Sequence, residues 1–261
     1  MEKDLLNILS SHPWADKLRW FDSIDSTNTQ AKILAQAGAP HGTVLIADLQ
    51  TGGRGRMGRS FSSPAGKGIY MSVVLRPECS AAELMHLTCA VAVAMCNAVE
   101  NITAFRPQVK WINDLLADGK KLGGILTELA LIPGTDKVDF AIIGVGINCL
   151  QSQEDFPADI RNIAISLKTA TKRTVKREVL AAAMIRSLFD MDSILLSSKA
   201  ALMEQYKRDC VTIGQNIYMI KGNEKLPCRG ISLDPDGALI VEFPDGSRQI
   251  VNSGEVSVRP Q

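Results

Sequence analysis

Arginine and glycine are concentrated in one segment of the chain, residues 50–68, which reads QTGGRGRMGRSFSSPAGKG. It holds Arg54, Arg56 and Arg59 and no acidic residue. Guanidinium groups bind phosphates and carboxylates through paired, charge-assisted hydrogen bonds, so this loop could close over an anion. A solvated surface loop or an arginine–glycine patch for nucleic acid would have the same composition. Two facts favour a ligand site: apolar runs flank the segment and fix its ends on a sheet, and the whole chain has a net charge of only +1.

The spacing Gly53-x-Gly55-x-x-Gly58 formally matches the dinucleotide-binding fingerprint, and it follows a predicted strand. That fingerprint must open a helix whose N-terminus binds the pyrophosphate. Here the sequence RSFSSPAG follows, which cannot begin a helix of useful length. A Rossmann-type nucleotide site is therefore not expected.

A second group of candidate residues forms a predicted hairpin. Asp118-Gly119 is a strong signal for a two-residue turn, and Lys121 begins the strand that follows it. Gly123 and Gly124 lie inside this strand, where glycine is unfavourable unless something approaches the backbone closely. A flat ligand on the two glycines, with its charged end at Lys121, would explain both features. A bend in the strand, with Lys121 in solvent, would explain them equally well.

Polar side chains in two further segments could complete a ligand site. The segment DSTN (25–28) begins a predicted helix, and Thr27 and Gln30 have the spacing of a capping box. Capping needs fewer polar side chains than these four, so the others could hydrogen-bond a small neutral ligand. The segment GVGIN (144–148) similarly ends a buried, glycine-containing strand in a polar side chain.

Hydrophobic patterning predicts the elements that must position these residues. Helices are expected before Pro13, from the DSTN segment to Gln36, from the Ser80/Glu83 capping box to Val99, and within residues 159–209. The expected strands are Leu18–Phe21, Thr43–Asp48, Ile69–Leu75, Gln108–Ile112, Leu115–Ala117, Lys121–Ala130 and Phe140–Cys149. Beyond Asp209, closely spaced turn signals separate short runs that fit only strands. The sequence therefore predicts an α+β protein: residues 1–210 form a mixed β-sheet domain with packed helices, and residues 211–261 form a small SH3-like β-barrel.

Composition and charge exclude several classes of protein. Hydrophobic residues make up 46% of the 261 residues, which excludes disorder as the main state. The six cysteines form no C-x-x-C pair and the three histidines are scattered, so neither a metal site nor a disulfide framework is expected. The N-terminal segment lacks a secretory apolar core, and the longest apolar stretch, near residues 89–96, is too short to span a membrane. These features favour a cytoplasmic protein that does not bind membranes.

Assembled in chain order, the motifs resemble those of the biotin–protein ligases, in the form that lacks an N-terminal DNA-binding domain. The matching segments are DSTN (25–28), QTGGRGRMGR (50–59), KWINDL (110–115), KKLGGIL (120–126) and GVGIN (144–148). Lipoate–protein ligases share the catalytic fold, but the arginine–glycine loop and the KWIND and KLGGIL segments look like the biotin branch. The resemblance implies that residues 1–210 are the catalytic domain, which binds biotin and ATP.

The resemblance implies an enzyme that works in two steps. The carboxylate of biotin attacks the α-phosphate of ATP, which gives biotinyl-5′-AMP and pyrophosphate. A lysine of a biotin carboxyl carrier protein then attacks the mixed anhydride and releases AMP. ATP and biotin are the expected substrates, with Mg²⁺ accompanying the nucleotide. The substrates supply both nucleophiles, which agrees with the absence of a Ser–His or Cys–His arrangement in the sequence.

The resemblance also implies roles for individual residues. The expected catalytic residues are Lys121, Arg54 and Arg56, which would neutralise charge around the carboxylate and the α-phosphate. The residues expected to bind biotin are Ser26, Thr27, Asn28, Gln50, Gly53, Arg54, Gly55, Arg56, Lys121, Gly123 and Gly124. The residues expected to bind ATP or AMP are Arg56, Arg59, Lys110, Asn113, Asp114 and Asn148.

The expected partner is a biotin carboxyl carrier protein or domain, and a homodimer formed at a sheet edge is compatible with the sequence. Some members of the family are biotin-sensing repressors with an N-terminal winged helix. Too few residues precede Asp25 for such a domain, so no DNA binding is expected. Two positions depart from the family pattern: Phe61 stands where Trp is usual, and Ile112 stands where Pro is usual. Neither departure removes a chemical group that the reaction needs.

Overall fold

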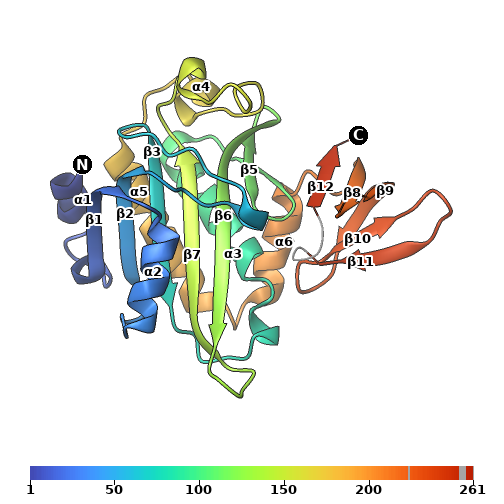
Figure 1. Cartoon of the computed structure of the whole chain (residues 1–261), viewed down its shortest axis with the longest axis horizontal. Coiled ribbons are helices and arrows are strands. Elements are labelled where there is room, and N and C mark those ends of the chain that lie inside the picture. The colour runs from blue at the N-terminus through green and yellow to red at the C-terminus, as the bar shows by residue number, and fades with distance from the viewer. Residues whose placement is uncertain (223, 253–256, 261) are drawn as a thin grey trace.

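A seven-stranded sheet forms the centre of the larger part of the chain in the computed structural model, which describes residues 1–222, 224–252 and 257–260 (Figure 1). Neighbouring strands are antiparallel except for β1 and β2, which are parallel. In the order of the sheet, the strands are β1 (Leu18–Ile24), β2 (Thr43–Gln50), β3 (Gly68–Leu75), β7 (Val138–Asn148), β6 (Lys120–Leu131), β5 (Asp114–Ala117) and β4 (Gln108–Lys110).

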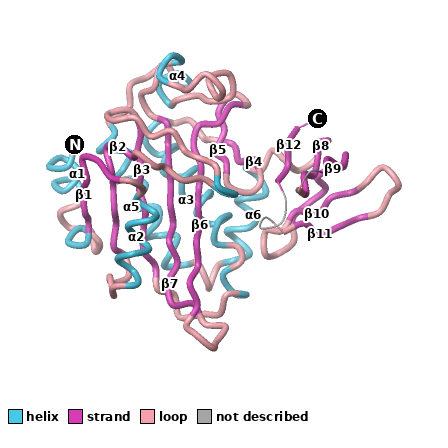
Figure 2. Tube along the Cα trace, in the orientation of Figure 1, coloured by secondary structure: helices cyan, strands magenta, loops and turns pink. Residues whose placement is uncertain are grey.

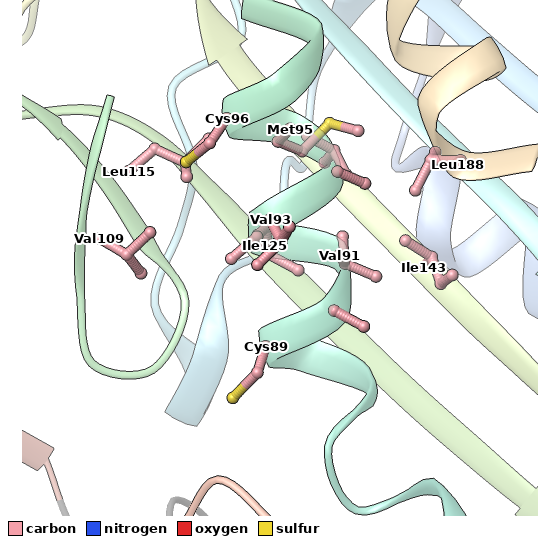
Figure 3. Close-up of a cluster of buried hydrophobic side chains, with 14 of the residues drawn as sticks. Cys89, Val91, Val93, Met95, Cys96, Val109, Leu115, Ile125, Ile143 and Leu188 are labelled. Atoms are coloured by element: carbon pink, nitrogen blue, oxygen red, sulfur yellow. The ribbon is translucent and has the colours of Figure 1, made fainter. Parts of the chain in front are cut away.

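One face of this sheet packs on a layer of helices. The helices α3 (Leu87–Thr103) and α5 (Arg177–Ile194) pack on each other and on this face, with α1 (Glu2–Ile8) against α5 and α6 (Lys199–Asp209) against α3. Side chains of α3 such as Val91 and Val93 meet Ile125 of β6 and Ile143 of β7 in the main hydrophobic core (Figure 3). Burial of these apolar surfaces is the main force that holds the helices on the sheet.

The opposite face of the sheet carries the helix α2 (Thr27–Gln36) and the long loop between β2 and β3 (Figure 1). A small apolar cluster that includes Ala31, Ala35, Phe140 and Ile142 fixes α2 there. Because this cluster covers only part of the face, the remainder is left for polar side chains and glycines. All the candidate ligand-binding residues of the DSTN segment and of the arginine–glycine loop lie on this side.

The helix α3 is the core helix of the protein. Together with the turn before it, the segment Ala82–Thr103 is long and apolar enough to cross a membrane, so the expectation that no apolar stretch has that length was wrong. In this fold, 72% of its most apolar window is buried inside the protein. Its apolar character is therefore explained by burial between the sheet and neighbouring helices.

Two helix starts differ from the expectation. Ser80 and Glu83 do form a capping box, in which each side chain bonds to the other residue's backbone N–H, but it opens only a short 3-10 helix at Ala82–Leu84. The helix α2 is capped by Ser26, which accepts from the backbone of Thr29, and not by Thr27. The backbone N–H of Thr27 instead donates to a side chain of β2, so the packing of α2 on the sheet determines which residue caps it.

The C-terminal part is a five-stranded antiparallel sheet (Figure 2). Its strands, in the order of the sheet, are β11 (Arg248–Val251), β10 (Leu239–Glu242), β9 (Glu224–Leu233), β8 (Asn216–Lys221) and β12 (Ser257–Pro260). Within this sheet, β8 and β12, the first and the last of its strands along the chain, are neighbours, as in SH3-like barrels. The predicted fold class is therefore confirmed: the protein is α+β, with helices packed on a mixed sheet and a small β-domain at the C-terminus. The division at residue 210 stays a prediction, since α6 ends at Asp209 and β8 begins only at Asn216.

Candidate active site

The candidate site lies on the face of the sheet that carries α2 and the β2–β3 loop, which we call the open face. Two rows of residues cross the strands there. In the first row, Ser72 of β3, Gly144 of β7 and Leu126 of β6 are paired neighbours. In the second row, Tyr70, Gly146 and Gly124 hold the corresponding positions. Glycine at 144, 146 and 124 removes the side chains that would otherwise stand on this face. The glycines therefore let other groups come close to the backbone of the sheet.

Asn28 occupies the first row. A Cβ atom at Gly144 would lie 2.0 Å from its Oδ1, so only glycine fits beneath it. The Asn28 side chain accepts a hydrogen bond from Ser72 Oγ at 2.6 Å and donates to Leu126 O at 3.2 Å and to Glu128 Oε2 at 3.0 Å. Hydrogen bonds to β3 on one side of β7 and to β6 on the other therefore fix the orientation of the Asn28 side chain.

Thr27, the residue before Asn28, joins a buried polar cluster. Thr27 donates from its backbone N and its Oγ1 to Gln50 Oε1, at 2.8 and 3.1 Å, and Gln50 Nε2 donates to Ser63 Oγ at 2.8 Å. Ser26 and Thr27 are each at most 4% exposed. Buried polar groups in such a network have fixed positions, which suits recognition of a small neutral ligand through a few directed hydrogen bonds.

Phe61 covers the second row. A Cβ atom at Gly146 would lie 2.5 Å from its ring, and one at Gly124 would lie 3.7 Å from it. The ring also meets Tyr70 edge-on, with centroids 6.4 Å apart. Phe61 thus holds the loop on the glycines, and it forms an apolar wall next to the polar cluster. Gly123 has a different position, because a Cβ atom there would lie 2.5 Å from the Gly146 carbonyl oxygen.

Arg56 and Lys121 contact two adjacent residues at one corner of the sheet: Asn113, just before β5, and Asp114, the first residue of β5. Arg56 Nη1 donates to Asn113 Oδ1 at 3.1 Å, and Lys121 Nζ lies 2.6 Å from Asp114 Oδ1. Asn113 is fixed on β6, since its Nδ2 donates to Ile125 O and its carbonyl accepts from Ile125 N. Burial lowers the pKa of the Arg56 guanidinium, an effect that Asp114 opposes. Two cations from distant parts of the chain thus come together, as a site for an anionic ligand requires.

The predicted hairpin positions Lys121 at this corner. Asp118 and Gly119 have φ of 49° and 71°, the left-handed conformations that a two-residue hairpin turn needs. The backbone of Lys121 also pairs with the chain near Ala164, through bonds to Ile163 O and from Ile165 N. The start of β6 is therefore held on both edges, which fixes the lysine side chain on the corner.

The other predicted nucleotide residues lie at or near the same corner. Lys110 of β4 is the paired neighbour of Asp114 in β5. Asn148 ends β7 and is buried, and its Nδ2 donates to Ile165 O at 3.2 Å. Arg59 is exposed and closes the turn that carries Arg56, since its carbonyl accepts from Gly55 N. Arg54 has a different partner: its guanidinium forms an ion pair with Glu128 of β6.

The corner is braced by the C-terminal domain. Trp111 donates its backbone N–H to Thr212 Oγ1 and its indole N–H to Gly237 O, each at 2.9 Å. The Tyr206 hydroxyl of α6 donates to Ile112 O at 3.0 Å. These three bonds hold the two residues that directly precede Asn113, so the small domain contributes to the position of the corner.

Reasoning from the sequence missed three polar residues of this site: Ser63, Ser72 and Glu128. Ser72 and Glu128 have signals that could have revealed them, whereas Ser63 lies in a polar loop and has none. Ser72 interrupts the apolar strand GIYMSVVL, and Glu128 is the acidic residue in KLGGILTELA, at even spacing from Gly124. A single polar residue in an apolar strand usually has a buried partner, and here both contact Asn28.

The described residues offer no thiol nucleophile and no metal cluster. Burial raises the pKa of Cys149 to about 12, and that of Cys89 and Cys96 even further, so these thiols are protonated at neutral pH. Among residues 1–222, 224–252 and 257–260, no group of three or more His, Cys, Asp or Glu side chains could hold a metal ion. The chemistry that this arrangement supports is stabilisation of negative charge on bound substrates.

Comparisons with known proteins identify the class. Residues 20–148 match the Biotin/lipoate A/B protein ligase family, and residues 212–259 match the Biotin protein ligase C terminal domain. The class defined by these matches is that of the biotin/lipoate protein ligases.

Individual relatives narrow the class. A bifunctional ligase/repressor BirA of Bacillus spizizenii is 34% identical over 253 residues, which cover 94% of this chain and 75% of the relative. A biotin–[acetyl-CoA-carboxylase] ligase of Mycobacterium tuberculosis is 30% identical, with 88% of this chain and 85% of the relative covered. The biotin protein ligase of Aquifex aeolicus in complex with biotin and ATP has a TM-score of 0.77 and 29% identity, and 94% of this chain and 99% of that chain are covered. This chain belongs to the biotin protein ligase family of enzymes.

Proposed function

We propose that this protein activates biotin with ATP as biotinyl-5′-AMP and transfers the biotinyl group to a lysine of a biotin carboxyl carrier protein or domain. The observation that carries the proposal is that Arg56 and Lys121 contact the adjacent residues Asn113 and Asp114, on the same sheet as the buried polar cluster. This arrangement offers a neutral recognition site at one end and two cations at the other. Biotin has the same two ends, a neutral ureido ring and a carboxylate.

The ureido ring would lie at the polar cluster. A cyclic urea has both hydrogen-bond donors and an acceptor, so it needs partners of both kinds. The cluster supplies them from Ser26, Thr27, Asn28 and Gln50. Gly124 and Gly146, with Phe61 above them, would border the apolar part of the ligand. Gly53 would assist by letting the loop turn closely, because a Cβ atom there would meet the Phe61 carbonyl oxygen at 2.3 Å.

The reaction would take place at the cationic corner. One oxygen of the biotin carboxylate attacks the α-phosphorus of ATP, the bond to the β-phosphate breaks, and pyrophosphate leaves with the electron pair. Lys121 and Arg56 would donate to the α-phosphate oxygens and to the carboxylate, and so stabilise the negative charge of the transition state. In the second step the carrier lysine amine attacks the acyl carbon, AMP leaves, and the amine loses a proton.

The remaining nucleotide contacts would come from Lys110, Asn113, Asp114 and Asn148, and from Arg59 on the loop. Mg²⁺ is expected to arrive on the phosphates of ATP, as it commonly does in nucleotide sites. The described residues hold no cluster of three carboxylate, thiolate or imidazole ligands, so phosphate oxygens and water would supply most of its ligands. When bound, the ion would neutralise phosphate charge.

The relatives support the choice of carrier. Those named biotin–[acetyl-CoA-carboxylase] ligase act, by name, on a carboxylase, and a biotinylated carboxylase subunit is the partner that we propose for this chain. A cytoplasmic location, a homodimer and the absence of DNA binding stay predictions. The last of these matters because several relatives are named ligase/repressor.

Mass spectrometry of a carrier domain tests the proposal. The domain is incubated with the protein, ATP and Mg²⁺, and with biotin, lipoate or both. We expect the mass of one biotinyl group on a single lysine, with no lipoyl group added even when both acids are present. Lipoyl addition, or no modification of any carboxylase carrier domain, would contradict it.

A further inference from the structure

We infer that Glu128 is the positioning residue of the arginine–glycine loop, and that Arg54 binds this carboxylate and not the substrate. Glu128 lies on β6 on the open face of the sheet. Its Oε1 accepts from Arg54 Nη2 at 3.1 Å, and its Oε2 accepts from Arg54 Nη1 at 3.2 Å. A third bond comes from Asn28 Nδ2 at 3.0 Å. This inference rests on the proposed function.

The geometry distinguishes this ion pair from an ordinary surface pair. Exposed single-contact pairs contribute little to stability, but a bidentate arginine–carboxylate pair is geometrically specific. The Glu128 side chain is only 22% exposed, against 44% for Arg54. Glu128 is also fixed by the Asn28 amide, which is itself held by Ser72. The carboxylate is therefore a rigid anchor, and the arginine is the part that the loop brings to it.

The anchor lies where it controls Arg56. The backbone of Arg54 forms a bridge with Ser60, and the N–H of Gly55 donates to Arg59 O at 2.6 Å, so residues 54–60 form one tight turn. Fixing Arg54 at one end of this turn restricts where Arg56 can lie. Without such an anchor, a segment so rich in glycine would have a large conformational entropy to lose when it closes over a ligand.

The partners of the two arginines also separate their roles. The guanidinium of Arg54 is neutralised by Glu128, and both of its terminal nitrogens are used there. The guanidinium of Arg56 donates instead to the Asn113 amide oxygen, at the corner where Lys121 contacts Asp114. Under the proposed function Arg56 and Lys121 bind the carboxylate and the phosphate at this corner, and Arg54, bound to Glu128 on β6, serves to hold the loop.

A double-mutant cycle on the full-length protein tests the inference. The variants are Glu128→Gln, Arg54→Gln, their combination, and the charge exchange Arg54→Glu with Glu128→Arg. Glu242→Gln is the control, since it removes the same charge from an ion pair with Arg248 on the C-terminal sheet, at 2.9 Å. Two quantities are measured: hydrogen–deuterium exchange of residues 53–61 in the ligand-free protein, and the dissociation rate of bound biotinyl-5′-AMP.

We expect each single variant to raise both rates about tenfold, which corresponds to about 1.4 kcal/mol. The combined variant should be no worse than the worse single variant, and the charge exchange should restore at least part of the effect, because the two side chains act as one unit. Glu242→Gln should leave both rates unchanged.

Two results would overturn the inference: faster dissociation in Arg54→Gln but not in Glu128→Gln, or fully additive effects. The first would make Arg54 a substrate ligand. If the wild-type protein formed no adenylate at all, the proposed function would fail, while hydrogen exchange in the ligand-free protein would still decide whether Glu128 holds the loop.

Discussion

Replacement of Gly144 by Ala tests the way that the DSTN segment and the sheet fit together. The new Cβ would lie 2.0 Å from Asn28 Oδ1, whereas an ordinary contact needs about 3.4 Å. The backbone of β7 cannot give way, because it is paired with β3 on one side and β6 on the other. Asn28 must therefore move by more than 1 Å, which is enough to break its 2.6 Å bond with Ser72. Overpacking in a well-packed region costs about 1–3 kcal/mol, and loss of one hydrogen bond costs about 1 kcal/mol.

Isothermal titration calorimetry with biotin, together with urea denaturation, measures this effect. If the site binds biotin through Asn28, the affinity should fall at least tenfold, which corresponds to about 1.4 kcal/mol, and the free energy of unfolding should fall by about 2–4 kcal/mol. Gly52→Ala is the control, since its Cβ would make only an ordinary 3.4 Å contact, with Asp25 O. In an Asn28→Ser background the cost of Gly144→Ala should be smaller. Unchanged biotin affinity in Gly144→Ala would refute the placement of biotin beside Asn28.

Three other substitutions address the chemistry and the brace. Lys121→Ala should slow adenylate formation more than transfer from pre-formed biotinyl-5′-AMP, as single-turnover kinetics would reveal; equal slowing of both steps would argue against charge stabilisation at the α-phosphate. Arg56→Gly should release the adenylate early, so that bystander lysines become biotinylated; unchanged labelling selectivity on a mixture of proteins would remove Arg56 from that role. Trp111→Phe removes the bond to Gly237 O and should lower the free energy of unfolding by about 1–2 kcal/mol, with an accompanying fall in kcat; an unaltered kcat would show that the brace does not position the corner.

Much of the fold could be predicted from the sequence because local signals agreed with the final structure. The Asp118-Gly119 turn, the alternation of faces along the strands and the buried helix α3 are all properties of short segments. The start of α2 could not be predicted in detail, since the Thr27 N–H that would have needed a cap is bonded by Gln50, a residue of another element. Tertiary contacts of this kind are invisible to spacing rules.

In the candidate site, too, local features could be predicted from the sequence and tertiary contacts could not. Arg56 and Lys121 could be selected because their segments have unusual composition, but the sequence did not reveal that Arg54 binds Glu128 whereas Arg56 binds Asn113. In the sequence, Glu128 has the pattern of an ordinary polar residue of a strand. Only the structure reveals its contact with Arg54. Phe61 is a similar case. Its place on Gly146 follows from the path of the loop over the sheet, which no local pattern encodes.

A crystal structure of the protein with a non-hydrolysable biotinyl-adenylate analogue tests the central claim most directly. The account predicts that the phosphate lies within hydrogen-bond distance of both Arg56 and Lys121, with the ureido ring at Ser26, Thr27 and Asn28. An analogue bound with its phosphate away from the Asn113–Asp114 corner, or with its ring outside the polar cluster, would contradict it.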